Sequence, residues 1–153
     1  MHITKLFLLA ILSLFLTACD NHLEEPTNYA GNAKRTETNC LESCDSCTTD
    51  DKLELSLDTE KTIKGISTGP CIAYGETCIF SDTCSWSFDG TYQTDGPSAN
   101  STFSFTSCNS GKFRAEGYGS FRDGKSSGNV KCFTSDTNSM TLEWTDVPLT
   151  TSK

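Results

Sequence analysis

Apolar and polar residues alternate along most of the chain from residue 53 onward, and a period of two predicts β-strands. Leu53, Leu55 and Leu57 show the pattern most clearly, since each is separated from the next by one polar residue. The same alternation marks residues 84–92, 103–105, 113–121, 130–133 and 140–144. We expect each of these segments to place one face on a core and the other in water.

Short segments rich in Gly, Asn and Asp separate these strands at a spacing of roughly ten residues. Examples are Asp58-Thr59, Asn109-Ser110-Gly111 and Asp123-Gly124. No long segment has helical periodicity. The pattern therefore predicts an all-β domain, a small antiparallel meander folded as a barrel or a sandwich. Its predicted core consists of Trp86, Phe88, Phe103, Phe105, Phe113, Phe121, Val130, Leu142 and Trp144.

One short helix is expected at the start of this domain. Asn39 followed by Glu42 matches a capping box, and Cys40, Cys44 and Cys47 fall at helical spacing on one face. The preceding residues, 19–38, have few large apolar side chains and no periodicity. We interpret 19–38 as a flexible tether, with Leu23 and Tyr29 exposed to solvent, and 39–153 as the folded domain.

The N-terminus has the features of an export signal. Residues 6–16 are almost entirely apolar, but a helix of that length reaches only roughly 17 Å, against about 30 Å for a bilayer core. We therefore interpret 1–18 as a signal peptide rather than a membrane span.

Leu16-Thr17-Ala18-Cys19 follows directly and resembles the lipobox of bacterial lipoproteins. That resemblance implies cleavage after Ala18, a diacylglycerol thioether on Cys19 and an added acyl chain such as palmitate, which together anchor a protein stably. An ordinary secretory signal is the alternative, and bulky Leu16 fits its small-x-small pattern poorly. Asp20 matches an inner-membrane retention signal of enteric bacteria, so the choice of membrane, and of periplasmic or surface exposure, stays open.

Cysteine parity agrees with lipidation. The chain has nine cysteines. Without Cys19, an even set remains that can pair fully in an oxidising compartment. This set is Cys40, Cys44, Cys47, Cys71, Cys78, Cys84, Cys108 and Cys132. The connectivity is one of about 105. At least one cysteine of the first three must pair outside that cluster, and we consider Cys108–Cys132 and Cys78–Cys84 as candidate pairs.

Net charge and histidine content limit the kinds of binding and catalysis that the domain can perform. Removal of the signal leaves a formal charge of about −9, which disfavours binding to nucleic acids and anionic lipid surfaces. The mature chain has one histidine, His22, outside the predicted domain. Histidine-dependent hydrolysis and His-based zinc sites are therefore excluded from the domain. Cys44-Asp45-Ser46-Cys47 lacks the βαβ context of a redox centre, and we favour structural disulfides over redox or zinc chemistry. No metal or cofactor is expected.

Carboxylates and aromatic residues remain as candidates for function. Asp89, Glu116 and Glu143 lie in or beside strands, but Glu116 and Glu143 alternate out of phase with the apolar residues, which places them in solvent. Tyr92, Tyr118 and Trp144, together with Trp86, are candidates for a ligand patch. The competing interpretation assigns both tryptophans to the core.

Two functions are compatible with these features. The first is a membrane-anchored lipoprotein of the cell envelope with a non-enzymatic role, either structural or in binding a protein, glycan or small ligand. The second is a carboxylate-dependent hydrolase acting on envelope polysaccharide. Small disulfide-bonded β lipoproteins that inhibit lysozymes are similar in plan, although their motif residues are not found in this chain.

Overall fold

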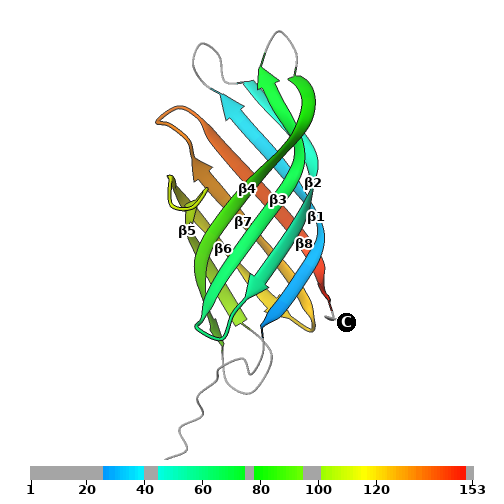
Figure 1. Ribbon diagram of the computed structural model, residues 1–153, viewed down its shortest axis with the longest axis vertical. Coiled ribbons are helices and arrows are strands. Elements are labelled where there is room, and N and C mark those ends of the chain that lie inside the picture. The colour runs from blue at the N-terminus through cyan, green and yellow to red at the C-terminus, as the bar shows by residue number, and fades with distance from the viewer. Residues whose placement is uncertain (1–25, 40–44, 75–77, 95–100, 151–153) are drawn as a thin grey trace, which may run out of the picture.

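The computed structural model describes residues 26–39, 45–74, 78–94 and 101–150, which form a closed barrel of eight antiparallel strands in sequence order (Figure 1). The strands are β1 (Thr27–Asn39), β2 (Asp45–Leu57), β3 (Thr62–Tyr74), β4 (Cys78–Thr94), β5 (Ser101–Cys108), β6 (Phe113–Arg122), β7 (Lys125–Phe133) and β8 (Ser139–Thr150). The predicted all-β meander is confirmed, and of the two architectures considered it is the barrel. The described part of the chain contains no helix with the length and hydropathy needed to cross a bilayer.

The barrel interior is a packed core, as the alternation predicts. Leu53, Leu55 and Leu57 of β2 are buried, whereas the residues between them are exposed. Phe103 lies among three aromatic rings, with centroids 5.5 Å from Phe105, 4.8 Å from Phe121 and 5.9 Å from Trp144. Of the predicted core, Trp86 and Phe113 are only partly buried and pack against its edge.

Glycines on β6 and β7 make room for this aromatic cluster. A Cβ atom at Gly119 would come within 2.2 Å of the Phe103 ring, and one at Gly128 within 2.9 Å of both Phe103 and Trp144. Both contacts are shorter than side chains tolerate. The two glycines therefore allow a large aromatic core inside a barrel of only eight strands.

The folded domain begins earlier than expected. Thr27–Asn39 is strand β1, which pairs with β2 and β8, so the predicted tether over 19–38 is wrong from residue 27 onward. Tyr29 is 7% exposed and stacks on Phe121 at 4.7 Å, in contrast to the solvent exposure expected for it. Leu23 lies outside the described residues. The strand escaped prediction because its other inward positions carry small or charged residues rather than large apolar ones.

The predicted helix falls mainly on residues 40–44, outside the described part. The two ends of the predicted helix pattern are described. Asn39 is the last residue of β1, and Cys47 lies in β2, opposite Glu37. The described residues on either side of 40–44 therefore lie in paired strands.

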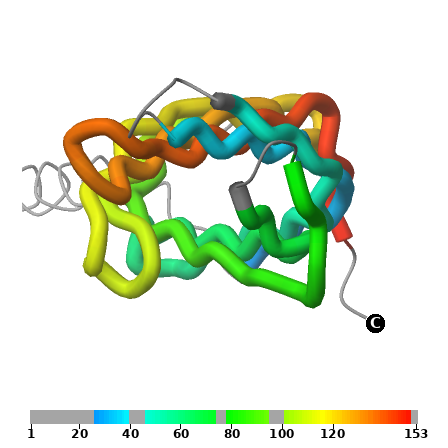
Figure 2. The backbone as a smooth tube through the Cα atoms, turned by 90° about the horizontal axis from the view of Figure 1, so that it is seen from above, coloured from blue at the N-terminus to red at the C-terminus, as the bar shows by residue number. Residues whose placement is uncertain are grey.

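The barrel has two distinct ends. β1 begins at Thr27, beside the turn that follows β2, and we call this the N-terminal end. At the other end, which we call the mouth, lie the β5–β6 and β7–β8 turns and the far end of the β3–β4 hairpin (Figure 1). The Cys47–Cys78 disulfide ties the start of β4 to β2, and this hairpin lies over one side of the opening (Figure 2).

Three disulfides cross-link the described strands: Cys47–Cys78, Cys71–Cys84 and Cys108–Cys132. The last confirms the predicted pair, and Cys47 pairs outside its cluster as parity required. The predicted Cys78–Cys84 pair is wrong, because both residues lie on β4. Six residues of extended strand span roughly 20 Å, far beyond the reach of a disulfide. Cys19, Cys40 and Cys44 lie outside the described residues.

The Cys108–Cys132 disulfide should contribute strongly to stability. It closes a loop of 24 residues and lies fully buried between β5 and β7. Replacing both cysteines by alanine should lower the free energy of unfolding by roughly 3 kcal/mol, measured by urea denaturation. A loss below about 1 kcal/mol would contradict this role.

Candidate binding site at the mouth of the barrel

The seam between β2 and β3 is incomplete near the mouth. The β2–β3 ladder runs from Leu57 opposite Ile63 to Lys52 opposite Thr68. Next on β3 come Gly69 and Pro70, where the pairing of β3 with β4 also shifts register. Proline has no N–H to donate to a ladder. The two strands are therefore held together by other interactions beyond this point.

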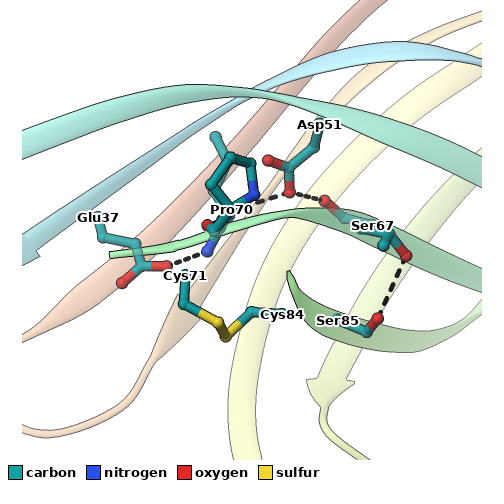
Figure 3. A network of polar contacts seen from close by, with 9 residues as sticks. Glu37, Asp51, Ser67, Pro70, Cys71, Cys84 and Ser85 are labelled. Carbon is teal, nitrogen blue, oxygen red and sulfur yellow. Dashed lines mark hydrogen bonds and ion pairs between the residues drawn. A yellow bond between two sulfur atoms is a disulfide. The ribbon is translucent and has the colours of Figure 1, made fainter. Parts of the chain in front are cut away.

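A buried ion pair closes this seam. Arg35 reaches in from β1 and is 0% exposed, with its Nε 2.9 Å from Oδ2 of Asp51 on β2. Its Nη2 donates a hydrogen bond to the carbonyl of Pro70 on β3, and Ser67 donates to the same Asp51 oxygen (Figure 3). One guanidinium thus links three strands.

Gly69 is required for this arrangement. A Cβ atom at residue 69 would lie 2.0 Å from Oδ1 of Asp51. Only glycine leaves space for the carboxylate against the β3 backbone. The absence of a side chain at residue 69 is therefore what leaves room for the buried ion pair beside β3.

Glu37 connects the ion pair to the surface. Nη1 of Arg35 donates to its carboxylate, and the Trp86 side chain is a further hydrogen-bond partner. Burial raises the pKa of Glu37 above its usual range, and the nearby charge of Asp51 adds to this rise, although Arg35 acts in the opposite direction. One guanidinium is therefore shared by two carboxylates, of which Asp51 is 2% exposed and Glu37 lies toward the opening.

Glu37 borders a cavity of about 250 Å³ at the mouth. Six of its eight lining residues have polar or charged side chains, and Trp86 and Met140 add apolar surface. The lining residues are Glu37, Thr38, Asn39, Trp86, Thr134, Asn138, Ser139 and Met140. They come from the end of β1, from β4, and from the β7–β8 turn with the start of β8.

Local hydrogen bonds hold the β7–β8 wall of this mouth pocket. The carbonyl of Asn138 accepts from the backbone N–H of Thr134 at 3.1 Å and from that of Ser135 at 3.3 Å. The backbone N–H of Asn138 donates to the Ser135 hydroxyl at 3.0 Å. Met140 is buried at the base, and Trp86 packs beside Phe113 at a centroid distance of 6.4 Å.

A second cavity, of about 450 Å³, lies along β1, β2 and β3. It is lined by Asn28, Tyr29, Ala30, Glu54, Leu55, Ser56, Lys64, Ile66 and Thr150. Glu54 and Lys64 are its only charged lining residues. It is larger than the mouth pocket, but none of the buried polar or charged residues in the described part of the chain lines it, and we regard the mouth as the candidate site.

The predicted aromatic patch does not form. Tyr92 is buried, and its hydroxyl donates to the carbonyl of Asp58 at the N-terminal end. Trp144 is buried in the core, where its indole N–H donates to the Ser126 hydroxyl at 3.0 Å. Tyr118 is 71% exposed. The alternation of β-strand side chains separates them, since Tyr92 and Trp144 point inward and Tyr118 outward.

The carboxylates considered for hydrolysis do not line either cavity. Glu116 is exposed and pairs with Arg114, and Glu143 is exposed on β8, as their phase in the strands predicts. Asp89 lies on β4 opposite Ser107. Among the described residues, no group of three or more His, Cys, Asp or Glu side chains could hold a metal ion. Cys47 of the C-x-x-C motif is bonded to Cys78, while its other cysteine, Cys44, lies outside the described residues.

The sequence contained one signal for the buried network. Asp51 continues the inward phase of Leu53, Leu55 and Leu57, so strict alternation places a carboxylate inside the barrel. Arg35 had no comparable signal, because β1 itself was not recognised. No protein-family model matches the chain, and neither a curated protein nor a solved structure shows significant similarity to it.

Removing the guanidinium should be strongly destabilising. Arg35→Met leaves two carboxylates without their cation, which should lower the free energy of unfolding by about 3–5 kcal/mol. Adding Asp51→Asn should recover part of the loss, because the buried charge is then neutralised at nearly constant shape. Urea unfolding of the two single variants and the double variant measures the coupling. Strictly additive losses would contradict the ion pair.

The pKa of Glu37 makes a second prediction. Because this pKa is raised in the folded state, ionisation of Glu37 lowers the stability of the fold as the pH rises through it. Glu37→Gln is neutral at every pH and should gain stability relative to the wild type as the pH rises above the ordinary range of a glutamate pKa. Glu143→Gln, on the exposed outer face, serves as the matched control. A difference that stays constant or falls with pH would refute the assignment.

Proposed function

We propose that this chain is a membrane-anchored lipoprotein of the bacterial cell envelope and that its barrel is a non-enzymatic binding module. The lipobox-like Leu16–Cys19 segment supports the anchor. The three disulfides of the described barrel support export, since disulfides form and persist in oxidising compartments. Together they favour an envelope location over a cytoplasmic one.

The binding proposal rests on the position of the mouth pocket. β1 begins at the N-terminal end of the barrel, and Cys19 precedes Thr27 by a short segment. A lipid on Cys19 would therefore hold the N-terminal end toward the bilayer. The mouth pocket lies at the opposite end, where it would face away from the membrane and be accessible to a partner.

The same geometry disfavours the alternative hydrolase. Glycoside hydrolysis requires two carboxyl groups facing one sugar, roughly 5–9.5 Å apart. Among the described residues, Glu37 is the one carboxylate that lines the mouth pocket, because Asp51 is buried beneath it against Gly69. A single carboxylate can accept a hydrogen bond from a ligand, but it cannot supply both an acid and a base.

Site-specific photo-crosslinking in cells tests this orientation. Asp136 lies exposed in the β7–β8 turn at the mouth, and Glu60 lies exposed in the β2–β3 turn at the N-terminal end. A photo-reactive residue at position 136 should yield adducts with envelope components, whereas one at position 60 should yield few. Cys19→Ala should abolish acylation and release the protein from the membrane fraction.

Two outcomes would contradict the proposal. Adducts that form mainly from position 60 would place the binding surface at the wrong end. Acylation or membrane retention that survives Cys19→Ala would remove the anchor.

A further inference from the structure

We infer that the open edge of β4 at the mouth binds an extended, positively charged peptide segment of a partner protein, which adds one strand to the sheet. The edge consists of residues Cys78–Trp86, and we call it the β4 edge. The inference rests on the proposed binding role and deepens it by naming the class of partner.

The β4 edge has no neighbouring strand on its outer side among the described residues. β4 has 17 residues and β5 has 8, and their pairing begins at Phe88 opposite Cys108. One residue further, the N–H of Asn109 donates to the carbonyl of Ser87 at 2.8 Å, and its side-chain oxygen accepts from the N–H of Ser87 at 3.2 Å. Beyond this contact β4 continues past the β5–β6 turn at the mouth (Figure 1).

Backbone groups of this edge face outward at regular intervals. In an antiparallel strand, the N–H and C=O of one residue point to the same neighbour, and those of the next residue point to the other side. The groups of Ser87 point to Asn109, away from β3. Those of Ser85, two residues earlier, therefore point to the open side as well.

The same phase continues across the bulge in β4. Gly69 and Cys71 lie two residues apart on β3, so their backbone groups point to the same neighbour, which is β4. Ser81 is paired with Cys71 and therefore points to β3, which leaves the groups of Phe80 pointing outward. Phe80 and Ser85 are thus two positions at which an added strand can pair.

An edge of this kind selects a polypeptide. Outward N–H and C=O groups recur along a strand roughly every 7 Å, and an extended peptide carries complementary groups at the same spacing. Sugars and lipids have no such repeat. Natural proteins often protect open edges with lysine or proline, and residues 78–86 contain neither.

Apolar side chains flank the edge on both faces. Ile79 is 52% exposed and Phe80 is 49% exposed. Neighbouring residues of a strand point to opposite faces of a sheet, so one of these side chains lies on each face. Apolar side chains of an added strand would pack beside them.

The charge of the edge favours a basic peptide. Asp82 is exposed, and it is the only charged residue in 78–86. It takes part in none of the ion pairs of the described chain. A second copy of this chain is disfavoured as the partner, because two barrels of formal charge −8 repel each other and antiparallel pairing of their edges would bring two Asp82 side chains together.

Two disulfides hold the edge before a partner binds. Cys47–Cys78 ties the first residue of the edge to β2, and Cys71–Cys84 ties the other side of the bulge to β3. The extended backbone is therefore preformed. This lowers the entropic cost of binding, since the peptide is the part that must become ordered.

Hydrogen exchange measured by NMR tests the pairing directly. Random nine-residue peptides displayed on phage are selected against the mature lipoprotein in detergent micelles, and the most enriched sequences are synthesised as probes. We expect them to alternate apolar residues with lysine or arginine. With nine-tenths of the protein bound, exchange of the Ser85 amide should slow about 10-fold, because only the free fraction exchanges. Exchange of the Trp86 amide, which faces β3, should not change.

Ser85→Pro and Ser85→Ala form a matched pair of variants. Both remove the hydroxyl that lies 3.2 Å from that of Thr68, but only proline removes the outward N–H. Ser85→Pro should weaken probe binding about 3- to 10-fold relative to Ser85→Ala, the effect of one lost hydrogen bond. N-methylation of the probe tests the same bonds without changing the protein. Methyl groups on the alternate amides of one probe edge should abolish binding, and those on the other edge should not.

Asp82 and Asp123 form a second matched pair. Both are exposed and have positive φ, 44° for Asp82 and 51° for Asp123, but Asp123 lies in the β6–β7 turn at the N-terminal end. Asp82→Asn should weaken a basic probe about 2- to 5-fold, the effect of one exposed ion pair, and Asp123→Asn should not.

The peptide assignment is overturned if no sequence is enriched, if bound probes leave Ser85 exchange unchanged, or if the members of either variant pair bind the probe equally. It is also overturned if the Ser85 amide is already protected in a dimer of the lipoprotein. Such failures are distinguishable from failure of the proposed function. Crosslinks from position 136 to an envelope component would still support a binding module with another ligand, whereas slowed Ser85 exchange with membrane retention of Cys19→Ala would remove the anchor alone.

Discussion

The buried ion pair between Arg35 and Asp51 is the interaction on which the mouth of this barrel depends. A closed barrel requires every strand to pair with its neighbours, yet the β2–β3 ladder stops at Lys52 and Thr68. Pro70 cannot extend it. Arg35 replaces the missing ladder bonds by contacting Asp51 on β2 and the Pro70 carbonyl on β3. Burying these charges is costly, and we infer that this pair is retained because it fixes one arrangement of β1, β2 and β3.

The ion pair also explains the polar character of the mouth. The interior near the N-terminal end is filled mainly by aromatic and aliphatic side chains, with Ser101 and Ser126 as its buried polar residues, whereas the buried charges of the described chain, Arg35 and Asp51, lie near the mouth. The Arg35–Asp51 contact is ionic rather than a well-directed hydrogen bond, and Oδ1 of Asp51 has no hydrogen-bond partner among the described residues. Glu37 shares the guanidinium and carries this polar network to the mouth pocket.

Sequence patterns predicted the fold class because the two-residue alternation is strong in β2 and in β4 to β8. They missed β3, because its inward positions after Ile63 are Gly65 and Ser67 rather than large apolar residues. They missed β1 because Tyr29 is the only large apolar residue among its inward positions, and because an arginine is normally expected in solvent. The register of strand pairing could not be predicted from the pattern either. The register of β3 on β4 places Gly69 opposite Cys84 and Tyr74 opposite Cys78, and it decides which cysteines can meet. No rule of sequence spacing gives this register. The candidate site was missed for the same reason, since it joins residues from β1, β4 and β8.

The disulfides and the lipobox converge on one account: an exported barrel, anchored at one end and held in a single arrangement at the other. Mass spectrometry of the membrane-extracted protein, with peptide mapping before and after reduction, tests it most directly. The account predicts an acylated N-terminal Cys19 and three linked pairs, Cys47–Cys78, Cys71–Cys84 and Cys108–Cys132. An unacylated N-terminus, or free thiols at these positions without reduction, would contradict it.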